Sequence, residues 1–336
     1  MDRPTPNRHN LTPHWRDKYR FPRTNRRRDR LTFVAKTVPG DPKRIDKYLV
    51  ERFGGYSRSF FQQLLADGRV VLNGEKVTKN RHIKDADVIT VFLEEGAPDI
   101  AEDIPFDILY EDDWLIVVVK PAGIVVHPAR GNLTGTLHNA LRGHFDSLFE
   151  ADPEFRIYNL HRLDKYTSGV MVFGKEKWTT GRIGLQFERR EVKKRYLLAV
   201  QGSVEWENCR CDLPLGHDPV NRHRIVIEGN NPRPSSTEFR RRVKTKEYSV
   251  LEAHPLTGRS HQIRVHIASL GYPIIGDVFY GGVSELPALG YAADRSFLHA
   301  WTLSFYHPRL EKMMTFAAPL PDDFIELTGP ISPTGL

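Results

Sequence analysis

The segment NLHRLDKYTSGVMVFGK, residues 159–175, joins a compact charged and hydroxyl-rich turn to an apolar run that is typical of a β-strand. Within the turn, Asp164 lies between the basic pair His161-Arg162 and the run Thr-Ser-Gly at 167–169. A nearby cation can keep a carboxylate ionised and positioned for catalysis. The alternative is a structural salt bridge, and a single carboxylate on its own favours that alternative. The role of Asp164 therefore depends on what the rest of the chain supplies.

Composition indicates a folded protein with one large and one smaller domain, since hydrophobic residues make up 40% and aromatic residues 10% of the 336 residues. The apolar runs are strand-sized and fall short of the roughly 18 residues of a membrane span, so no membrane association is expected. The N-terminus lacks the apolar core of a secretory signal. Cys209 and Cys211 suit neither a disulfide loop nor a zinc site. A reducing cytoplasm is the expected location.

The net charge of +7 comes from the N-terminus, where residues 1–30 contain ten Lys/Arg and three Asp/Glu. Such a basic segment suits a polyanion such as RNA, although a solvated extension explains the charge equally well. Residues 1–38 are rich in proline and arginine, and we expect them to be a largely disordered tail. Aromatic residues among these cations can stack on bases or dock on the protein itself; they are Trp15, Tyr19 and Phe21.

A small module is predicted over residues 42–97. Apolar residues at helical spacing begin at Ile45, and a second helix is expected to start at an N-cap, Ser57. Residues 70–72 form a short apolar run, Asn73-Gly74 indicates a tight hairpin turn, and residues 88–92 predict a closing strand. This pattern resembles the S4 domain, a small RNA-binding module.

The S4 resemblance implies an RNA-contacting face formed by the second helix and the turn after it. Five polar residues occupy matching positions and are expected to bind RNA: Arg44, Ser57, Arg58, Gln62 and Arg69. The alternative is that some of these side chains only solvate helix faces.

The larger domain is predicted over residues 107–329, after an acidic linker at 98–106. Strands are expected at 115–119 and 191–202, and a hairpin at 238–254. Helices are expected at 136–145 and 178–187, and a turn followed by a helix at 257–269. Many short strands with a few helices indicate an α+β fold.

Common cofactor and metal motifs are absent from the sequence. It contains no zinc-ligand pattern, no phosphate-binding glycine loop and no G-x-S-x-G nucleophile motif. His254, His261 and His266 share a region but lack the spacing and the carboxylate partner of a metal site. We therefore expect neither a cofactor nor a metal.

Three motifs together resemble the RluA family of pseudouridine synthases. They are, in chain order, HRLDKYTSG at 161–169, KKRYLLAVQG at 193–202 and TGRSHQIRVH at 257–266. The preceding S4-like module fits the RluD-like and RluC-like members of this family. The resemblance implies a mixed, mainly antiparallel sheet and an enzyme that isomerises uridine in RNA.

The resemblance also implies catalytic roles for three residues. Asp164 matches the essential aspartate, which acts on the ribose or base of the target uridine. Tyr196 matches the tyrosine that packs against the base and is implicated in proton removal. Arg264 matches the basic partner of the aspartate.

Further residues match positions that contact the substrate or support the turn. Arg162 matches the arginine that enters the RNA stack when the uridine flips out. Leu198 is expected to line the pocket. Thr167 is expected to support the turn and to bind the substrate there. His161 and Gly169 are interpreted as supports of the turn. Tyr166 falls in the variable pair of the motif and is expected to bear on substrate choice.

The sequence therefore predicts a monomeric RNA pseudouridine synthase acting on large-subunit ribosomal RNA. A tRNA-directed synthase is the alternative within the same class. A non-catalytic RNA-binding ribosome-assembly factor is the alternative of a different class, and loss of a catalytic residue would have favoured it.

Overall fold

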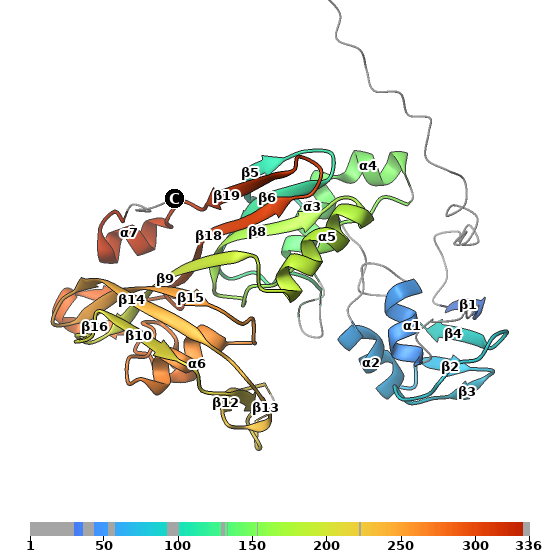
Figure 1. The fold of residues 1–336 in the computed structure, drawn as a ribbon, viewed down its shortest axis with the longest axis horizontal. Coiled ribbons are helices and arrows are strands. Elements are labelled where there is room, and N and C mark those ends of the chain that lie inside the picture. Colours follow the sequence, from blue (N-terminus) through green and yellow to red (C-terminus); the bar gives the residue numbers. More distant parts are fainter. Residues whose placement is uncertain are drawn as a thin grey trace, which may run out of the picture. The chain divides into compact units, whose positions relative to one another are not determined.

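The computed structural model describes residues 30–35, 44–52, 58–92, 101–128, 132, 134–152, 154–221 and 223–331. These residues belong to two compact units, Met1–Glu95 and Gly96–Leu336 (Figure 1).

The first unit contains a four-stranded antiparallel sheet in the order β1-β4-β2-β3. Its strands are β1 (Arg30–Val34), β2 (Val70–Leu72), β3 (Glu75–Lys76) and β4 (Val88–Phe92), and its helices are α1 (Ile45–Arg52) and α2 (Arg58–Ala66). Both helices and the sheet share one apolar core, in which Leu49, Phe61 and Ile89 are buried. Asn73 and Gly74 join β2 to β3 with φ of 52° and 88°, which confirms the predicted hairpin turn.

Strand β1 corrects the predicted extent of the N-terminal tail. The sequence interpretation placed residues 1–38 in one disordered segment, but Arg30–Val34 pair with β4 along their whole length. Phe33 packs against the core of this unit and Ala35 is buried. The short apolar run RLTFVA was hidden by the proline and arginine around it. Residues 1–29, including the three aromatic residues of the tail, lie outside the described residues.

The second unit is built on a ten-stranded sheet with the order β10-β14-β15-β9-β18-β8-β6-β5, to which β19 adds beside β18 and β7 beside β8. Its strands are β5 (Asp107–Glu111), β6 (Leu115–Lys120), β7 (Tyr158–Asn159), β8 (Ser168–Gly174), β9 (Lys193–Gln201), β10 (Asn208–Cys211), β14 (Thr237–Lys244), β15 (Tyr248–Pro255), β18 (Leu298–His307) and β19 (Lys312–Ala317). Of the pairings between these described strands, β8 with β18 is parallel and the others are antiparallel. The predicted mixed, mainly antiparallel sheet is therefore confirmed.

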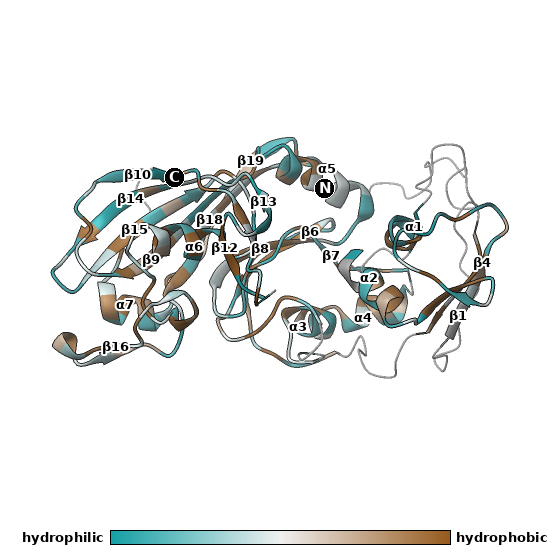
Figure 2. Ribbon diagram, turned by 90° about the horizontal axis from the view of Figure 1, so that it is seen from below, coloured by the Kyte–Doolittle hydropathy of each residue, from teal (hydrophilic) through white to brown (hydrophobic). Residues whose placement is uncertain are grey.

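Helices cover both faces of the sheet around β6 and β8, which explains why these strands are apolar without alternation. Side chains of α3 (Leu137–His144) pack on one face, where Ile116 and Met171 are buried. Side chains of α5 (Lys177–Glu188) pack on the other, where Val117 and Val172 are buried. Figure 2 shows apolar residues along the strands of this unit. Thr136 caps α3 through a capping box, so the helix begins where the sequence predicted.

Further elements surround the end of the sheet near β9 and β15. Helix α6 (Gln262–Ser269) buries Ile263 and Ile267 in the core beneath these strands. A small three-stranded sheet contacts α6 through β12 (Ile225–Ile227), and a short 3₁₀ turn, η2 (Val278–Tyr280), contacts α6 as well. The remaining elements are α4 (Asp146–Ala151), β11 (Leu215–His217), β12 (Ile225–Ile227), β13 (Asn230–Arg233), η2 (Val278–Tyr280), β16 (Glu285–Leu286), η3 (Pro287–Leu289), β17 (Tyr291–Ala292) and α7 (Asp322–Thr328). Among the described residues, no helix has the length and apolar character needed to cross a membrane.

Candidate active site

Asp164 lies in the turn that leads into β8, and the backbone of β8 fixes this turn. The Thr167 amide donates to the carbonyl oxygen of Asp164 at 3.2 Å. Gly169 has φ of +121°, and a Cβ placed on it would lie 2.1 Å from the carbonyl oxygen of Ala300 in β18. A glycine is required for this close approach. The Thr-Ser-Gly run therefore sets where Asp164 emerges from the sheet.

Lys120 holds the same turn from the end of β6. Its buried ammonium donates to three carbonyl oxygens, those of Pro121 at 2.7 Å, Ile124 at 2.9 Å and Lys165 at 3.1 Å. Burial lowers the pKa of Lys120 to about 7, and the negative charge of Asp164 opposes this shift. The sequence interpretation predicted the apolar strand at 115–119 but assigned no role to Lys120. A lysine at the end of such a strand was the available signal.

Arg264 on α6 brings the third motif to Asp164. Its Nη1 donates to Oδ2 of Asp164 at 3.0 Å. Its Nε and Nη2 donate to the two carboxylate oxygens of Asp277 at 2.6 Å and 2.8 Å. Burial by itself would lower the pKa of Arg264, but the two carboxylates outweigh it and raise the pKa above its ordinary value. Arg264 is thus a fixed cation between two carboxylates, and Asp277 was missed by the sequence interpretation.

His261 is a second group beside Asp164 that the sequence interpretation missed. Its Nε2 lies 3.8 Å from Oδ2 of Asp164, and its Nδ1 lies 2.7 Å from the Tyr280 hydroxyl. The Tyr280 oxygen accepts from the Ile225 amide at 3.2 Å, so its own proton is free to point to Nδ1. In the tautomer that accepts at Nδ1, His261 carries its proton on Nε2, on the side of the carboxylate. Burial lowers the pKa of His261, which favours this neutral form.

Tyr196 on β9 lies between two alanines, Ala253 of β15 and Ala300 of β18. These small neighbours leave room for the ring, which packs against the cores on both sides of this part of the sheet. Burial, and then the charge of Asp164, raise the pKa of Tyr196 well above its ordinary value. The phenol is therefore protonated at neutral pH and lies within electrostatic reach of Asp164.

The other predicted residues of this unit differ in accessibility. The Asp164 side chain is 23% exposed, and Arg162 is exposed beside it. The charge of Arg162 adds to the burial that lowers the pKa of His261. Thr167 and Leu198 are only 3% and 0% exposed, so their predicted contacts with a substrate stay predictions.

His161 has a structural environment. Its Nε2 accepts from the Val172 amide at 3.1 Å, and its ring stacks on Phe187. Burial lowers its pKa to about 3, so the ring is neutral. These contacts support its interpretation as part of the scaffold.

In the first unit, three predicted RNA-binding side chains converge on Asp46, which has no exposed surface. Its carboxylate accepts from Arg44 at 3.0 Å, from Arg58 at 2.9 Å and from Gln62 at 2.7 Å. Burial alone would raise the pKa of Asp46, but these hydrogen bonds outweigh it and lower the pKa to about 2. Arg69 is half-buried after α2.

Ser57 lies outside the described residues. No group of three or more potential metal-binding side chains occurs within the described ranges.

Comparisons with known proteins agree on both units. Residues 114–269 match the family described as RNA pseudouridylate synthase, and residues 43–89 match the S4 domain. The chain is 37% identical over 289 residues to an uncharacterized RNA pseudouridine synthase, YlyB, of Bacillus subtilis, covering 85% of this chain and 93% of that protein. It is 36% identical to ribosomal large subunit pseudouridine synthase D of Vibrio vulnificus, covering 85% and 90%. The structure of human RNA pseudouridylate synthase domain containing 1 is similar, with a TM-score of 0.52 and 27% identity over 66% of this chain and 86% of that one.

Proposed function

This chain belongs to the RNA pseudouridylate synthase family, and from that premise we propose that it isomerises uridines of large-subunit ribosomal RNA with Asp164, Tyr196 and Arg264 as its catalytic residues. The ribosomal substrate is supported by relatives named large subunit pseudouridine synthase D, which are 36% identical and align with 85–88% of this chain. The first unit contains an S4 domain, which is an RNA-binding module, and this fits an RNA substrate.

The observation that carries the proposal is the hydrogen-bonded ion pair between Asp164 and Arg264. The two residues are 100 positions apart in the chain, yet the pair is 3.0 Å long. Arg264 is held by Asp277 and keeps its charge, so Asp164 has a permanent cationic partner. A partly exposed carboxylate that is paired with a fixed cation suits chemistry at a ribose carbon.

The reaction breaks the N1–C1′ bond of uridine, turns the uracil and forms a C5–C1′ bond. Positive charge develops at C1′ as the first bond breaks, and the Asp164 carboxylate would stabilise that charge. Over the whole reaction, C5 loses one proton and N1 gains one. No electrons or groups enter from outside, so the reaction needs no redox agent. The base must leave the RNA stack to reach them, at a cost of a few kcal/mol.

Tyr196 would act on the C5 proton as a neutral phenol. Its raised pKa makes a stored phenolate unfavourable. The hydroxyl oxygen would instead take the C5 proton while its own proton passes to a neighbouring base. The Asp164 carboxylate, whose charge is felt at Tyr196, is the candidate acceptor, and passing this proton on to N1 would restore the carboxylate.

The test is to map pseudouridines in total RNA from cells with and without this gene, and from deleted cells that express Asp164→Asn. We expect one or more large-subunit sites to disappear on deletion and to return with the wild-type chain but not with Asp164→Asn. Binding of the variant to ribosomal RNA should survive, because the change removes one charge without removing the S4 unit. Lost sites in tRNA alone would overturn the ribosomal assignment. Unchanged sites with Asp164→Asn would overturn the mechanism.

A further inference from the structure

Two aromatic rings near Asp164 are open to solvent: one lies two residues after it in the chain, and the other reaches it through His261. Phe279 in η2 is 41% exposed, and Tyr166 in the Asp164 turn is 49% exposed. Most aromatic surface in a folded chain is buried, because burying such a ring contributes several kcal/mol. Exposed rings beside a catalytic carboxylate are therefore candidates for ligand contact.

Phe279 is positioned by two nearby residues that contact the catalytic cluster, one just before η2 and one within it. Asp277, two residues before it, pairs with Arg264, and Tyr280, directly after it, contacts His261. The Phe279 ring packs edge-on against His261, with centroids 6.2 Å apart. The ring is therefore presented one side chain away from Asp164. The guanidinium of Arg224, on the loop before β12, lies 5.9 Å from the ring centroid and adds a positive charge.

Tyr166 is fixed through the backbone of the residue before it. The Lys165 carbonyl accepts from the buried Lys120 ammonium at 3.1 Å and from the Gly123 amide at 2.9 Å. The Lys165 ammonium lies 5.5 Å from the Tyr166 ring. Each exposed ring thus has a cation beside it and a well-fixed backbone beneath it.

An aromatic face combined with a cation fits a nucleotide, because the ring stacks on a base and the cation attracts a phosphate. We propose that Phe279 and Tyr166 are stacking platforms for two RNA bases that lie near the target uridine in the same strand. The proposal rests on the proposed function and adds to it that this site grips an unpaired RNA strand rather than one flipped base in an intact duplex. Stacking on Phe279 and Tyr166 would then offset part of the free energy needed to unstack the RNA bases.

The test uses a short single-stranded RNA, eight cytidines around a central uridine, in which one cytidine is replaced by the fluorescent base 2-aminopurine. The replacement is placed in turn at the two positions on each side of the uridine. Stacking on an aromatic ring quenches this fluorophore. We expect the full-length wild-type chain to quench it at two positions. Phe279→Ala should abolish quenching at one of them and Tyr166→Ala at the other, each with about tenfold weaker binding.

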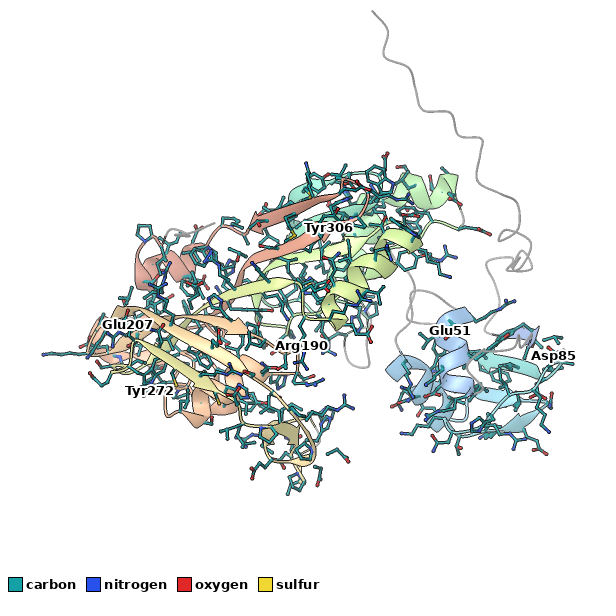
Figure 3. All side chains as sticks on the ribbon, viewed as in Figure 1. Glu51, Asp85, Arg190, Glu207, Tyr272 and Tyr306 are labelled. Atoms are coloured by element: carbon teal, nitrogen blue, oxygen red, sulfur yellow. The ribbon has the colours of Figure 1, made fainter. Side chains whose placement is uncertain are left out.

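Two further variants separate stacking from folding. Phe279→Trp keeps an aromatic face and should preserve quenching. Tyr306→Ala removes a ring that is 42% exposed on the β18–β19 hairpin, away from α6 (Figure 3), and should change neither quenching nor affinity.

The stacking proposal is wrong if the wild-type chain leaves the fluorescence unchanged at all four positions. It is also wrong if Phe279→Ala and Tyr166→Ala quench the fluorophore as the wild type does. If the wild-type chain quenches the fluorophore but forms no pseudouridine in ribosomal RNA, the proposed function is wrong and the stacking proposal still holds.

Discussion

Replacing Gly169 with alanine tests whether the close contact between β8 and β18 sets the position of Asp164. The new Cβ would lie 2.1 Å from the Ala300 oxygen and 2.6 Å from the Ala300 nitrogen, whereas such contacts are essentially never shorter than 3.0 Å. The two strands must therefore separate by close to 1 Å, and alanine must also adopt φ of +121°. Backbone strain costs about 1–3 kcal/mol and the overlap about as much again, which gives roughly 2–6 kcal/mol of lost stability.

The expected loss is a large part of the roughly 5–15 kcal/mol that stabilises a typical domain. Urea unfolding monitored by circular dichroism measures it, and pseudouridine formation on ribosomal RNA measures the catalytic effect. A displacement of about 1 Å at Asp164 should slow the reaction about 100-fold in the molecules that remain folded. The matched control is Gly181→Ala on α5, where a Cβ meets nothing within 4 Å, and which should gain about 1 kcal/mol. If Gly169→Ala is as stable and active as Gly181→Ala, β8 and β18 are not in close contact at Gly169, and this contact does not set the position of Asp164.

Further changes probe the other features of the two units. Tyr196→Phe keeps the ring and removes the hydroxyl, so it should slow pseudouridine formation about 100-fold or more while RNA affinity is unchanged; a near-normal rate would leave Tyr196 only a packing role. Burial lowers the pKa of His299 from 6.5 to about 4, so between these pH values the unfolded chain binds a proton that the folded chain does not. The free energy of unfolding should therefore fall by up to about 3 kcal/mol as the pH drops from 6.5 to 4. Urea titrations across that range should show a weaker dependence of this free energy on pH for His299→Gln, and an equal dependence would contradict a neutral His299. Asp46→Asn should weaken RNA binding severalfold in filter assays although it removes a negative charge, because two arginines lose their anchor; tighter binding would mean that they need none. Deleting residues 1–29, which spares β1, should flatten the salt dependence of RNA binding, and an unchanged slope would make the tail an inert extension.

The sequence was sufficient for the family and for the general architecture. Motif resemblance gave the family, which relatives of 36–37% identity confirm. It also gave a mixed sheet and an S4 domain, which the strand pairings and the S4 match confirm. The pairing of Asp164 with Arg264 was also expected from the motifs, and the two side chains do meet. Resemblance succeeds here because motif residues carry their spatial relations with them.

The supporting residues could not be found in the same way. Asp277, Lys120 and Tyr280 act through contacts that exist only after distant elements pack together. A carboxylate before a short 3₁₀ turn has no local pattern that points to Arg264. β1 was missed for a different reason, since five residues in a proline- and arginine-rich context give too weak a period.

The position of β18 in the sheet has a consequence for when the enzyme becomes active during its synthesis. This strand begins at Leu298, late in the chain, yet it lies between β9, which carries Tyr196, and β8, which follows Asp164. A ribosome that has made the first 297 residues has therefore made all three proposed catalytic residues but not the strand that joins their two half-sheets. Closure of the sheet has to wait for contacts of long sequence separation, which form slowly. An enzyme proposed to modify ribosomal RNA thus completes its active site only after Leu298–His307 has been synthesised and has joined β8 to β9.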